Sequence, residues 1–174
     1  MELNVQHAQP IKIRPLTIED FGYVLNWSQD DSFCSANEWE KKRNKEELFR
    51  WWEGCVKRET DDFIRMGIEF EKRLIGYVDL ACIKGKTAEL GIAIGESDLW
   101  GNGIGVKSCL CMMEFAVKNL GITVFYAETH ETNNRSRKML DKIGFKEISR
   151  NGSETYLGKE SQLIQYSCCI GGEL

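Results

Sequence analysis

Residues 99–108 read LWGNGIGVKS, and this stretch decides how the rest of the chain is interpreted. Three glycines alternate with other residues, and a Lys-Ser pair follows. A P-loop needs Gly-Lys-Ser in direct succession, whereas here Val106 separates Gly105 from Lys107. A dinucleotide-binding fingerprint needs G-x-G-x-x-G, whereas this stretch offers G-x-G-x-G. The stretch therefore misses both phosphate-binding patterns by one residue.

A strand is expected before this glycine stretch and a helix after it. Residues 87–94 (TAELGIAI) are typical of a strand, and residues 104–119 repeat apolar side chains with helical spacing. We expect one apolar stripe on that helix to face a sheet, made of Val106, Cys109, Leu110, Met113, Val117 and Leu120. Gly121 is placed to end the helix.

Such a strand, glycine turn and helix start form an anion site, because the first helical N–H groups lack intrahelical partners and the helix dipole favours negative charge. Glycines also let a phosphate approach the backbone closely. Backbone donors alone suit a pyrophosphate that is anchored rather than transferred. The alternative is a simple tight turn at Gly101-Asn102 with no ligand.

The other periodic segments predict a mixed α/β fold. A hydroxyl at Thr17 three residues before Asp20 indicates a helix start, Asn44 is a second candidate cap, and Lys72-Arg73 is expected at a hairpin tip. Either Asn133 or Asn134 could cap a short helix that Gly144 ends, with Ser136, Met139, Leu140 and Ile143 on its inner face. We expect helices at 18–29, 44–58, 104–119 and before Gly144, and strands near 11–15, 64–70, 75–77, 87–94, 123–128, 145–150 and 162–169.

These elements imply a mostly antiparallel central sheet of about six or seven strands, with helices on both faces, in a single domain spanning residues 1–174.

The net charge is −4, from 23 basic and 27 acidic residues, which argues against nucleic-acid binding and favours cationic partners. We find no 18-residue apolar run and no apolar core in MELNVQHAQP at residues 1–10, so neither a membrane span nor a signal peptide is expected. Seven cysteines without a C-x-x-C pair, beside only two histidines, predict free thiols in the cytoplasm and no metal.

A second motif lies downstream, where residues 133–145 read NNRSRKMLDKIGF. Together with LWGNGIG, it resembles the GNAT superfamily of acyl-CoA-dependent N-acyltransferases, most closely its ribosomal-protein N-terminal acetyltransferase-like branch. The family pattern Q/R-x-x-G-x-G/A falls on residues 100–105, with Trp100 in place of Gln or Arg. The second pattern matches at Asn133, Ser136, Gly144 and Phe145. The resemblance covers residues 10–169 in element order and is residue-specific mainly from 87 to 145.

The resemblance implies acetyl-CoA as cosubstrate. Its pyrophosphate would bind the backbone of Gly101, Asn102, Gly103, Ile104, Gly105 and Val106. Its pantetheine arm would lie where the strand ending at Ile94 and the strand ending near Glu128 diverge. There it would pair with the backbone of Ile92, Ala93 and Ile94 by strand addition, and Asn133 would contact it from the other side.

The implied reaction is direct transfer of an acetyl group to a primary amine, which must lose a proton. Glu89 is the first candidate base and Glu128 the second, although both can be plain strand carboxylates. Leu140 stands where many relatives have a tyrosine that acts as the general acid for the leaving thiolate. Ser136 can instead donate a hydrogen bond to the leaving sulfur, unless it only bonds the helix backbone. A backbone N–H near Ile94 would face the developing oxyanion. His130 is either a base or acceptor contact or a satisfied surface histidine.

The acceptor class stays open at this point: it is a peptide N-terminus, a polyamine or another small amine. No nucleic-acid or membrane partner is expected. The resemblance also allows a homodimer, as in many relatives. Four of the five tryptophans precede residue 53, where the family lines its acceptor site, but helical spacing also suits core packing. Two rival functions are an acyl-CoA-binding sensor without catalysis, suggested by Leu140, and a nucleotide-binding protein with a degenerate P-loop.

Overall fold

A computed structural model describes residues 10–171 of the chain. Residues 1–9 and 172–174 lie outside the described part. The first of these ranges includes most of residues 1–10, for which the sequence predicts no signal peptide. The helices are α1 (Phe21–Ser28), α2 (Asp31–Ala36), α3 (Lys45–Lys57), α4 (Ile104–Leu120) and α5 (Asn134–Ile143), with 3-10 turns at Ile18–Asp20 and Ser97–Leu99. The strands are β1 (Lys12–Arg14), β2 (Ile64–Phe70), β3 (Arg73–Lys84), β4 (Thr87–Ile94), β5 (Val124–His130), β6 (Lys146–Ser149), β7 (Ser153–Tyr156) and β8 (Lys159–Cys169).

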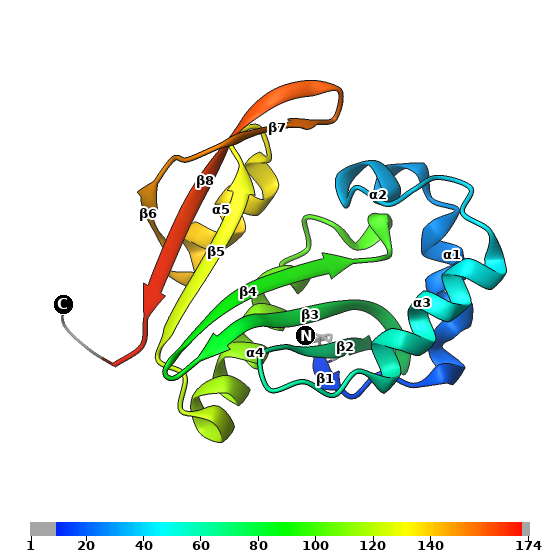
Figure 1. The fold of residues 1–174 in the computed structure, drawn as a ribbon, viewed down its shortest axis with the longest axis horizontal. Coiled ribbons are helices and arrows are strands. Elements are labelled where there is room, and N and C mark those ends of the chain that lie inside the picture. The colour runs from blue at the N-terminus through cyan, green and yellow to red at the C-terminus, as the bar shows by residue number, and fades with distance from the viewer. Residues whose placement is uncertain (1–9, 172–174) are drawn as a thin grey trace, which may run out of the picture.

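All eight strands belong to one sheet, in which β1-β2-β3-β4-β5-β8-β6 are successive neighbours and β7 pairs with β8. Every pairing is antiparallel except the central one, where β4 and β5 run parallel. That parallel ladder joins Thr87–Glu89 to residues 124–126 and then stops. Figure 1 shows β4 and β5 meeting at one end and spreading apart toward the other. The sheet is therefore split into a V at its centre.

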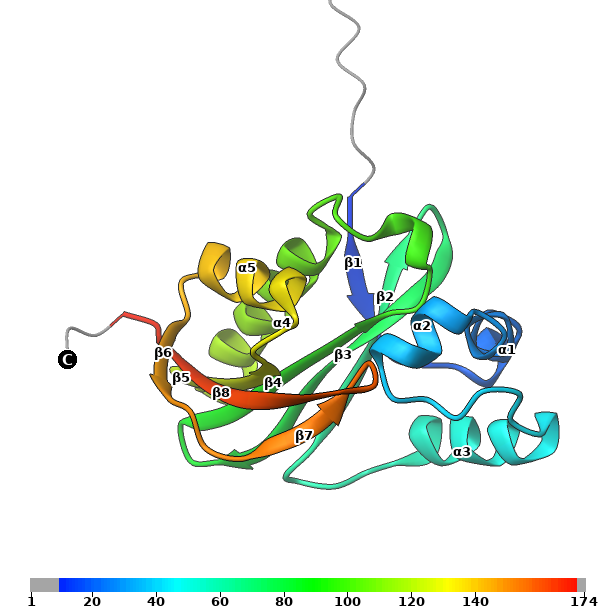
Figure 2. The same cartoon turned by 90° about the horizontal axis from the view of Figure 1, so that it is seen from above.

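Helices cover both faces of the sheet, as the sequence predicts. Figure 2 shows α4 and α5 on one side of the strands and α1, α2 and α3 toward the other. The larger core lies under α4 and α5 and contains Met112, Phe125, Phe145 and Ile164, each at most 1% exposed. The smaller core lies under α1–α3 and is rich in aromatic side chains. The expected mixed α/β fold is confirmed, with eight strands instead of six or seven.

Glycines bound α4 at both ends. Gly103 caps its start with a φ of 77°, and Gly121 ends it with a φ of 67°, so both have the left-handed backbone that glycine adopts without strain. The predicted apolar stripe on this helix is partly wrong. Leu110 is 47% exposed and Leu120 is 38% exposed. The buried face is rotated toward Ile104, Ser108, Cys109, Met112, Met113 and Ala116. Ser108 fits this face because its hydroxyl donates to the Ile104 carbonyl at 2.8 Å.

A partly buried ion pair fixes the start of α1. The helix expected from residue 18 begins as a 3-10 turn and becomes an α-helix at Phe21. Asp20 is 5% exposed, and its carboxylate accepts two hydrogen bonds from Arg14 at 2.8 and 2.9 Å and one from the Thr17 backbone N–H at 2.9 Å. Burial alone would raise the pKa of Asp20, but these donors outweigh it and hold the pKa below its ordinary value.

Three local features differ from the sequence-based predictions. The β2–β3 hairpin tip is Glu71-Lys72, one residue earlier than expected, because both residues adopt positive φ while Arg73 already pairs with Phe70. Helix α2 was not predicted, although the Asp30 side chain caps it by accepting from Ser32 and Phe33. Strand β7 was also not predicted. It joins β8 through a tight turn at Leu157-Gly158.

None of the helices in the described part is long and apolar enough to cross a membrane. All seven cysteines are free, as predicted. Cys109 is buried on α4, where burial raises the pKa of its thiol to about 12.

Candidate active site

A pocket of about 300 Å³ lies beside the end of β4 that has diverged from β5. It is lined by the end of β4, the glycine turn, the start of α4 and one face of α5, and the segment after α2 closes one side. The lining residues are Ala36, Asn37, Ile92, Ala93, Ile94, Leu99, Trp100, Gly101, Gly103, Ile104, Gly105, Val106, Asn133, Arg135, Ser136, Lys138, Met139 and Lys142. The two sequence motifs, more than 20 residues apart in the chain, thus meet at one cavity.

The glycine turn presents backbone to this pocket. Gly101 and Gly103 have φ values of 83° and 77°, and a Cβ at either would meet no heavy atom within 4 Å. Their backbone conformation, not lack of space, is what favours glycine. Gly105 has the opposite reason, because a Cβ there would lie 2.9 Å from the Met139 sulfur on α5. The start of α4, whose first N–H groups lack helical partners, therefore lines the pocket beside a close contact with α5.

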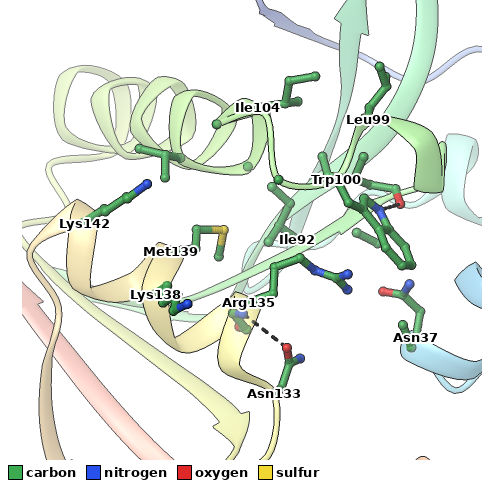
Figure 3. Close-up of a pocket in the computed structure, with 18 residues that line it drawn as sticks. Asn37, Ile92, Leu99, Trp100, Ile104, Asn133, Arg135, Lys138, Met139 and Lys142 are labelled. Atoms are coloured by element: carbon green, nitrogen blue, oxygen red, sulfur yellow. Dashed lines mark hydrogen bonds between the residues drawn. The ribbon is translucent and has the colours of Figure 1, made fainter.

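Trp100 links the glycine turn to the open edge of β4. Its indole Nε1 donates to the Ile94 carbonyl oxygen at 2.9 Å. Figure 3 shows this bond, with Arg135 reaching from α5 toward the same ring. The Arg135 guanidinium carbon lies 3.8 Å from the ring centroid, which is cation–π distance. One backbone acceptor expected to serve a bound pantetheine arm, the oxygen of Ile94, is thus already occupied by a side chain.

The charged residues lining the pocket are all cationic. Arg135, Lys138 and Lys142 lie one turn apart along α5, and no carboxylate is among the lining residues that the structure describes. Figure 3 shows the three side chains along the α5 side of the pocket. This local positive charge contrasts with the net charge of −4 of the chain as a whole. It complements a ligand with several negative charges.

Asn133 and Ser136 also lie where the motif places them, in the pocket lining. The Asn133 side-chain oxygen caps α5 by accepting from the Ser136 backbone N–H at 3.2 Å. Its amide NH₂ group makes no hydrogen bond among the described residues and is available to a ligand. The Ser136 hydroxyl likewise has no hydrogen-bond partner within residues 10–171. Leu140 is 3% exposed and belongs to the larger core, so it cannot serve a leaving group.

The two predicted carboxylate bases lie outside the pocket lining. Glu89 is exposed and sits in the closed part of the V, opposite Tyr126, about 10 Å along the strand from Ile92. Glu128 accepts a hydrogen bond from the Gln165 side chain at 2.8 Å. Asn102 is also absent from the lining, because its side chain turns back to donate to the Leu99 carbonyl at 3.2 Å.

A second cavity of about 540 Å³ adjoins the first and shares Ala36, Trp100, Asn133 and Arg135 with it. Its other lining residues are mostly polar and come from α2, the segment after β5 and the β7–β8 turn: Asp31, Ser32, Ser35, Thr132, Asn134, Tyr156 and Leu157. Tyr156 ties this turn to α2, since its hydroxyl donates to the Ala36 carbonyl at 3.3 Å. Two adjoining cavities therefore meet beside Trp100 and Arg135.

Sequence reasoning missed the cationic face of α5 and the whole second cavity. The spacing of Arg135, Lys138 and Lys142 was a usable signal, because residues three and four apart share a helix face. His130 was expected to be a satisfied surface histidine or a contact residue. Its side chain is only 13% exposed, and its Nδ1 is buried with no hydrogen-bond partner among the described residues, so the satisfied interpretation is wrong.

Comparison with known proteins agrees with this geometry. Residues 11–146 match the acetyltransferase (GNAT) domain family. An uncharacterised protein of Methanocaldococcus jannaschii is 29% identical over 88% of this chain and 30% of its own length. Human alpha/beta-tubulin-N-acetyltransferase 9 is 24% identical over 78% of this chain and 58% of its own length. The chain thus spans about a third to just over a half of these curated relatives.

Solved structures share the fold at low sequence identity. The spermidine N-acetyltransferase of Vibrio cholerae, in complex with CoA and spermine, superposes with a TM-score of 0.77 at 19% identity, covering 91% of this chain and 95% of that one. RimL, a ribosomal L7/L12 alpha-N-protein acetyltransferase in complex with coenzyme A, gives a TM-score of 0.79 at 15% identity, covering 92% and 94%. The family match over most of the chain, on a fold with the glycine turn and the split sheet, places this protein in the GNAT acetyltransferase family.

Proposed function

We propose that this protein transfers an acetyl group from acetyl-CoA to a primary amine. The observation that carries the proposal is the pocket beside the end of β4, where a glycine turn at a helix start faces three cationic side chains and no carboxylate. Backbone N–H groups and cations on opposite sides of one cavity suit a pyrophosphate with a further phosphate. The CoA bound to relatives of the same fold supports this assignment.

Each part of the pocket then has a role in holding acetyl-CoA. The N–H groups after Gly103 bind the pyrophosphate, and Arg135, Lys138 and Lys142 neutralise the remaining phosphate charge. The unpaired edge of β4 from Ile92 to Ile94 takes the pantetheine arm as an added strand. The free NH₂ group of Asn133 donates to the arm from the α5 side. Because the Ile94 carbonyl oxygen already accepts from the Trp100 indole, the neighbouring backbone groups of β4 would contact the pantetheine arm instead.

The reaction is an acyl exchange without a covalent enzyme intermediate. The amine nitrogen attacks the thioester carbonyl carbon, the C–S bond breaks, and CoA leaves as a thiolate that takes up a proton. The Ser136 hydroxyl, which lines the pocket and has no hydrogen-bond partner within residues 10–171, donates a hydrogen bond to the leaving sulfur. Glu89 stays a candidate base that would act through water, because it lies on β4 beyond the pocket lining.

The test combines binding and turnover. Calorimetry with CoA and with ATP measures which ligand the pocket prefers, and mass spectrometry follows acetylated products from a panel of polyamines, simple amines and short peptides. Mass detection is preferred to thiol-reactive dyes because the chain has seven cysteines of its own.

We expect CoA binding and at least one acetylated acceptor. CoA binding without any product would favour the acyl-CoA sensor, and tighter binding of ATP than of CoA would refute the assignment of the pocket. Ser136→Ala should lower kcat without changing the affinity for CoA.

A further inference from the structure

Trp100 is the residue of the first motif that departs from the family pattern, and the roles proposed above make no use of its side chain. The indole turns back along the chain, where Nε1 donates to the Ile94 carbonyl oxygen at 2.9 Å. Figure 3 shows this bond at the end of β4, close to Ile92. It joins the start of the glycine turn to a backbone group at the edge of the pocket.

The backbone groups of β4 alternate between the two edges of the strand. The Gly95 N–H donates to the Ile75 carbonyl of β3 at 2.7 Å, so Gly95 and every second residue before it face β3. Ile92 and Ile94 therefore face the other edge, which β5 leaves unpaired at this point. Among the described residues, the oxygen of Ile94 is the one group of these two residues that has a partner on that edge, and the partner is Trp100.

The end of β4 is held firmly in this orientation. The peptide group that follows Ile94 is fixed at both of its polar atoms, because its C=O accepts from Trp100 and its N–H, that of Gly95, donates to β3. Gly95 also packs closely on the buried ring of Trp27, with which a Cβ at this position would collide. The N–H of Ile94 is thus a preorganised donor at the open edge, the arrangement that stabilises charge developing on a carbonyl oxygen.

The bond from Trp100 limits how an extended ligand can pair with this edge. In order along the strand, the edge offers the N–H and C=O of Ile92 and then the N–H of Ile94, and it ends there because the next acceptor is occupied. With the Ile94 oxygen free, an amide N–H of a pantetheine arm could pair with it and carry the thioester past the Ile94 N–H. With that oxygen occupied, the last group on the edge is a donor and accepts only a carbonyl oxygen from the ligand.

We propose that Trp100 is a positioning residue: by occupying the Ile94 oxygen, it fixes the register in which the thioester carbonyl oxygen meets the Ile94 N–H. The inference rests on the proposed acetyl transfer and adds the side chain that decides where the reacting carbon lies. Arg135, whose guanidinium carbon is 3.8 Å from the indole centroid, helps to hold the ring in place.

The step that this register serves is the attack on the thioester. As the amine nitrogen bonds to the carbonyl carbon, the C=O electron pair moves onto the oxygen, and the Ile94 N–H donates to the resulting oxyanion. The electron pair then re-forms the carbonyl and the C–S bond breaks. The nitrogen gives up its proton to water, and the departing thiolate takes one up.

The test uses two unreactive analogues of acetyl-CoA, without any acceptor. In the ketone analogue a methylene group replaces the thioester sulfur, and in S-ethyl-CoA the carbonyl oxygen is missing. We expect calorimetry to show that wild-type protein binds the ketone about threefold to tenfold more tightly, as for one hydrogen bond. The infrared C=O stretch of bound, isotope-labelled acetyl-CoA should also lie below that of free acetyl-CoA, because a hydrogen-bond donor weakens the double bond.

Two replacements of Trp100 remove the indole N–H. One is Trp100→Phe, and the other is site-specific incorporation of benzothienylalanine, which keeps the bicyclic shape but has sulfur in place of the N–H. Both should abolish the preference for the ketone and return the C=O stretch toward its value in solution, while the affinity for S-ethyl-CoA changes only about twofold. With an acceptor that wild-type protein acetylates, kcat should fall about tenfold to a hundredfold.

Trp52→Phe is the matched control. The Trp52 indole also donates to a backbone carbonyl at 2.9 Å, that of Thr17, but Trp52 lies in the smaller core and outside the pocket lining. This variant should lower Tm at least as much as Trp100→Phe, and it should leave the ketone preference and the C=O stretch unchanged.

Three outcomes would overturn the inference. One is wild-type protein that binds both analogues equally and leaves the C=O stretch as it is in solution. Another is a ketone preference that survives both replacements of Trp100. The third is equal loss of both signals in Trp52→Phe, which would assign them to stability instead of the β4 edge. All three leave acetyl transfer intact, whereas failure to bind any CoA derivative would refute the proposed function itself.

Discussion

Gly103 and Gly121 flank α4 and provide a matched pair for testing the glycine turn. Both have positive φ, 77° and 67°, and a Cβ at either meets no heavy atom within 4 Å. Only Gly103 lines the pocket. Replacing either with alanine therefore adds the same left-handed backbone strain, about 1–2 kcal/mol, without a steric clash. For a chain of this size, 1 kcal/mol lowers Tm by about 2–4 °C, so both variants should melt about 2–8 °C below wild type.

The two variants should differ in their affinity for CoA. Relief of strain at residue 103 turns the N–H groups that follow it, and one lost hydrogen bond to a charged group is worth about 1.5–3 kcal/mol. Gly103→Ala should therefore bind CoA about tenfold to a hundredfold more weakly, whereas Gly121→Ala should bind it like wild type. Thermal melting and calorimetry with CoA measure both effects. Equal CoA affinity in two equally destabilised variants would refute the role given to the glycine turn.

Three further predictions concern the pocket and the core. Trp100→Phe keeps an aromatic ring under Arg135 but removes the hydrogen bond to the Ile94 carbonyl. Calorimetry should show altered CoA affinity, and Tm should fall by only a few degrees, because one hydrogen bond contributes about 1 kcal/mol. Unchanged CoA affinity would contradict the link between the indole and the β4 edge. Leu140→Tyr should lower Tm by overpacking the core, about 1–3 kcal/mol, without raising kcat, and a gain in turnover would show that a phenol can reach the site. Despite burial, pairing with Arg14 lowers the pKa of Asp20 in the folded protein. The stability from this pairing is therefore present above the ordinary carboxyl pKa near 3.9 and is lost as the pH falls through the lower folded value. Melting curves should show a steeper loss of Tm below about pH 4 for wild type than for Asp20→Asn.

The sequence predicted most of the elements that carry a strong local pattern. Helix α4 and strand β4 follow from periodicity, and the meeting of the two motifs follows from the resemblance to a known family. The direction of the α4 stripe was wrong because Val106, Leu110, Val117 and Leu120 suggest one face, whereas Ala116 and Ser108 are small enough to be buried on another. Side-chain size, which decides how closely a helix approaches the sheet, does not enter a count of apolar positions.

The proximity of Glu38, His130 and Glu154 beside the second cavity was not predictable from local signals. Glu38 follows a six-residue helix, and Glu154 lies on a four-residue strand in which only Tyr156 is buried. Their proximity to His130 depends on how the β7–β8 turn reaches α2, a contact between residues 120 positions apart at Tyr156 and Ala36. A single sequence contains no periodic pattern for such a contact.

The short ladder between β4 and β5 has a consequence for the order of folding during synthesis. Strands β2, β3 and β4 are joined by hairpins, and β1 pairs with β2 across the helical segment at residues 15–63, so these four strands can pair before the rest of the chain is made. β5 can add to β4 only after all of α4 has crossed the sheet, and three residue pairs then join the two halves. Until β5 and β8 arrive, Met112 and Ile68 lack the part of their core supplied by Phe125 and Ile164. The nascent chain thus exposes the β4 edge and one face of α4 until most of its length has been made, and this interval is when it most needs protection from aggregation.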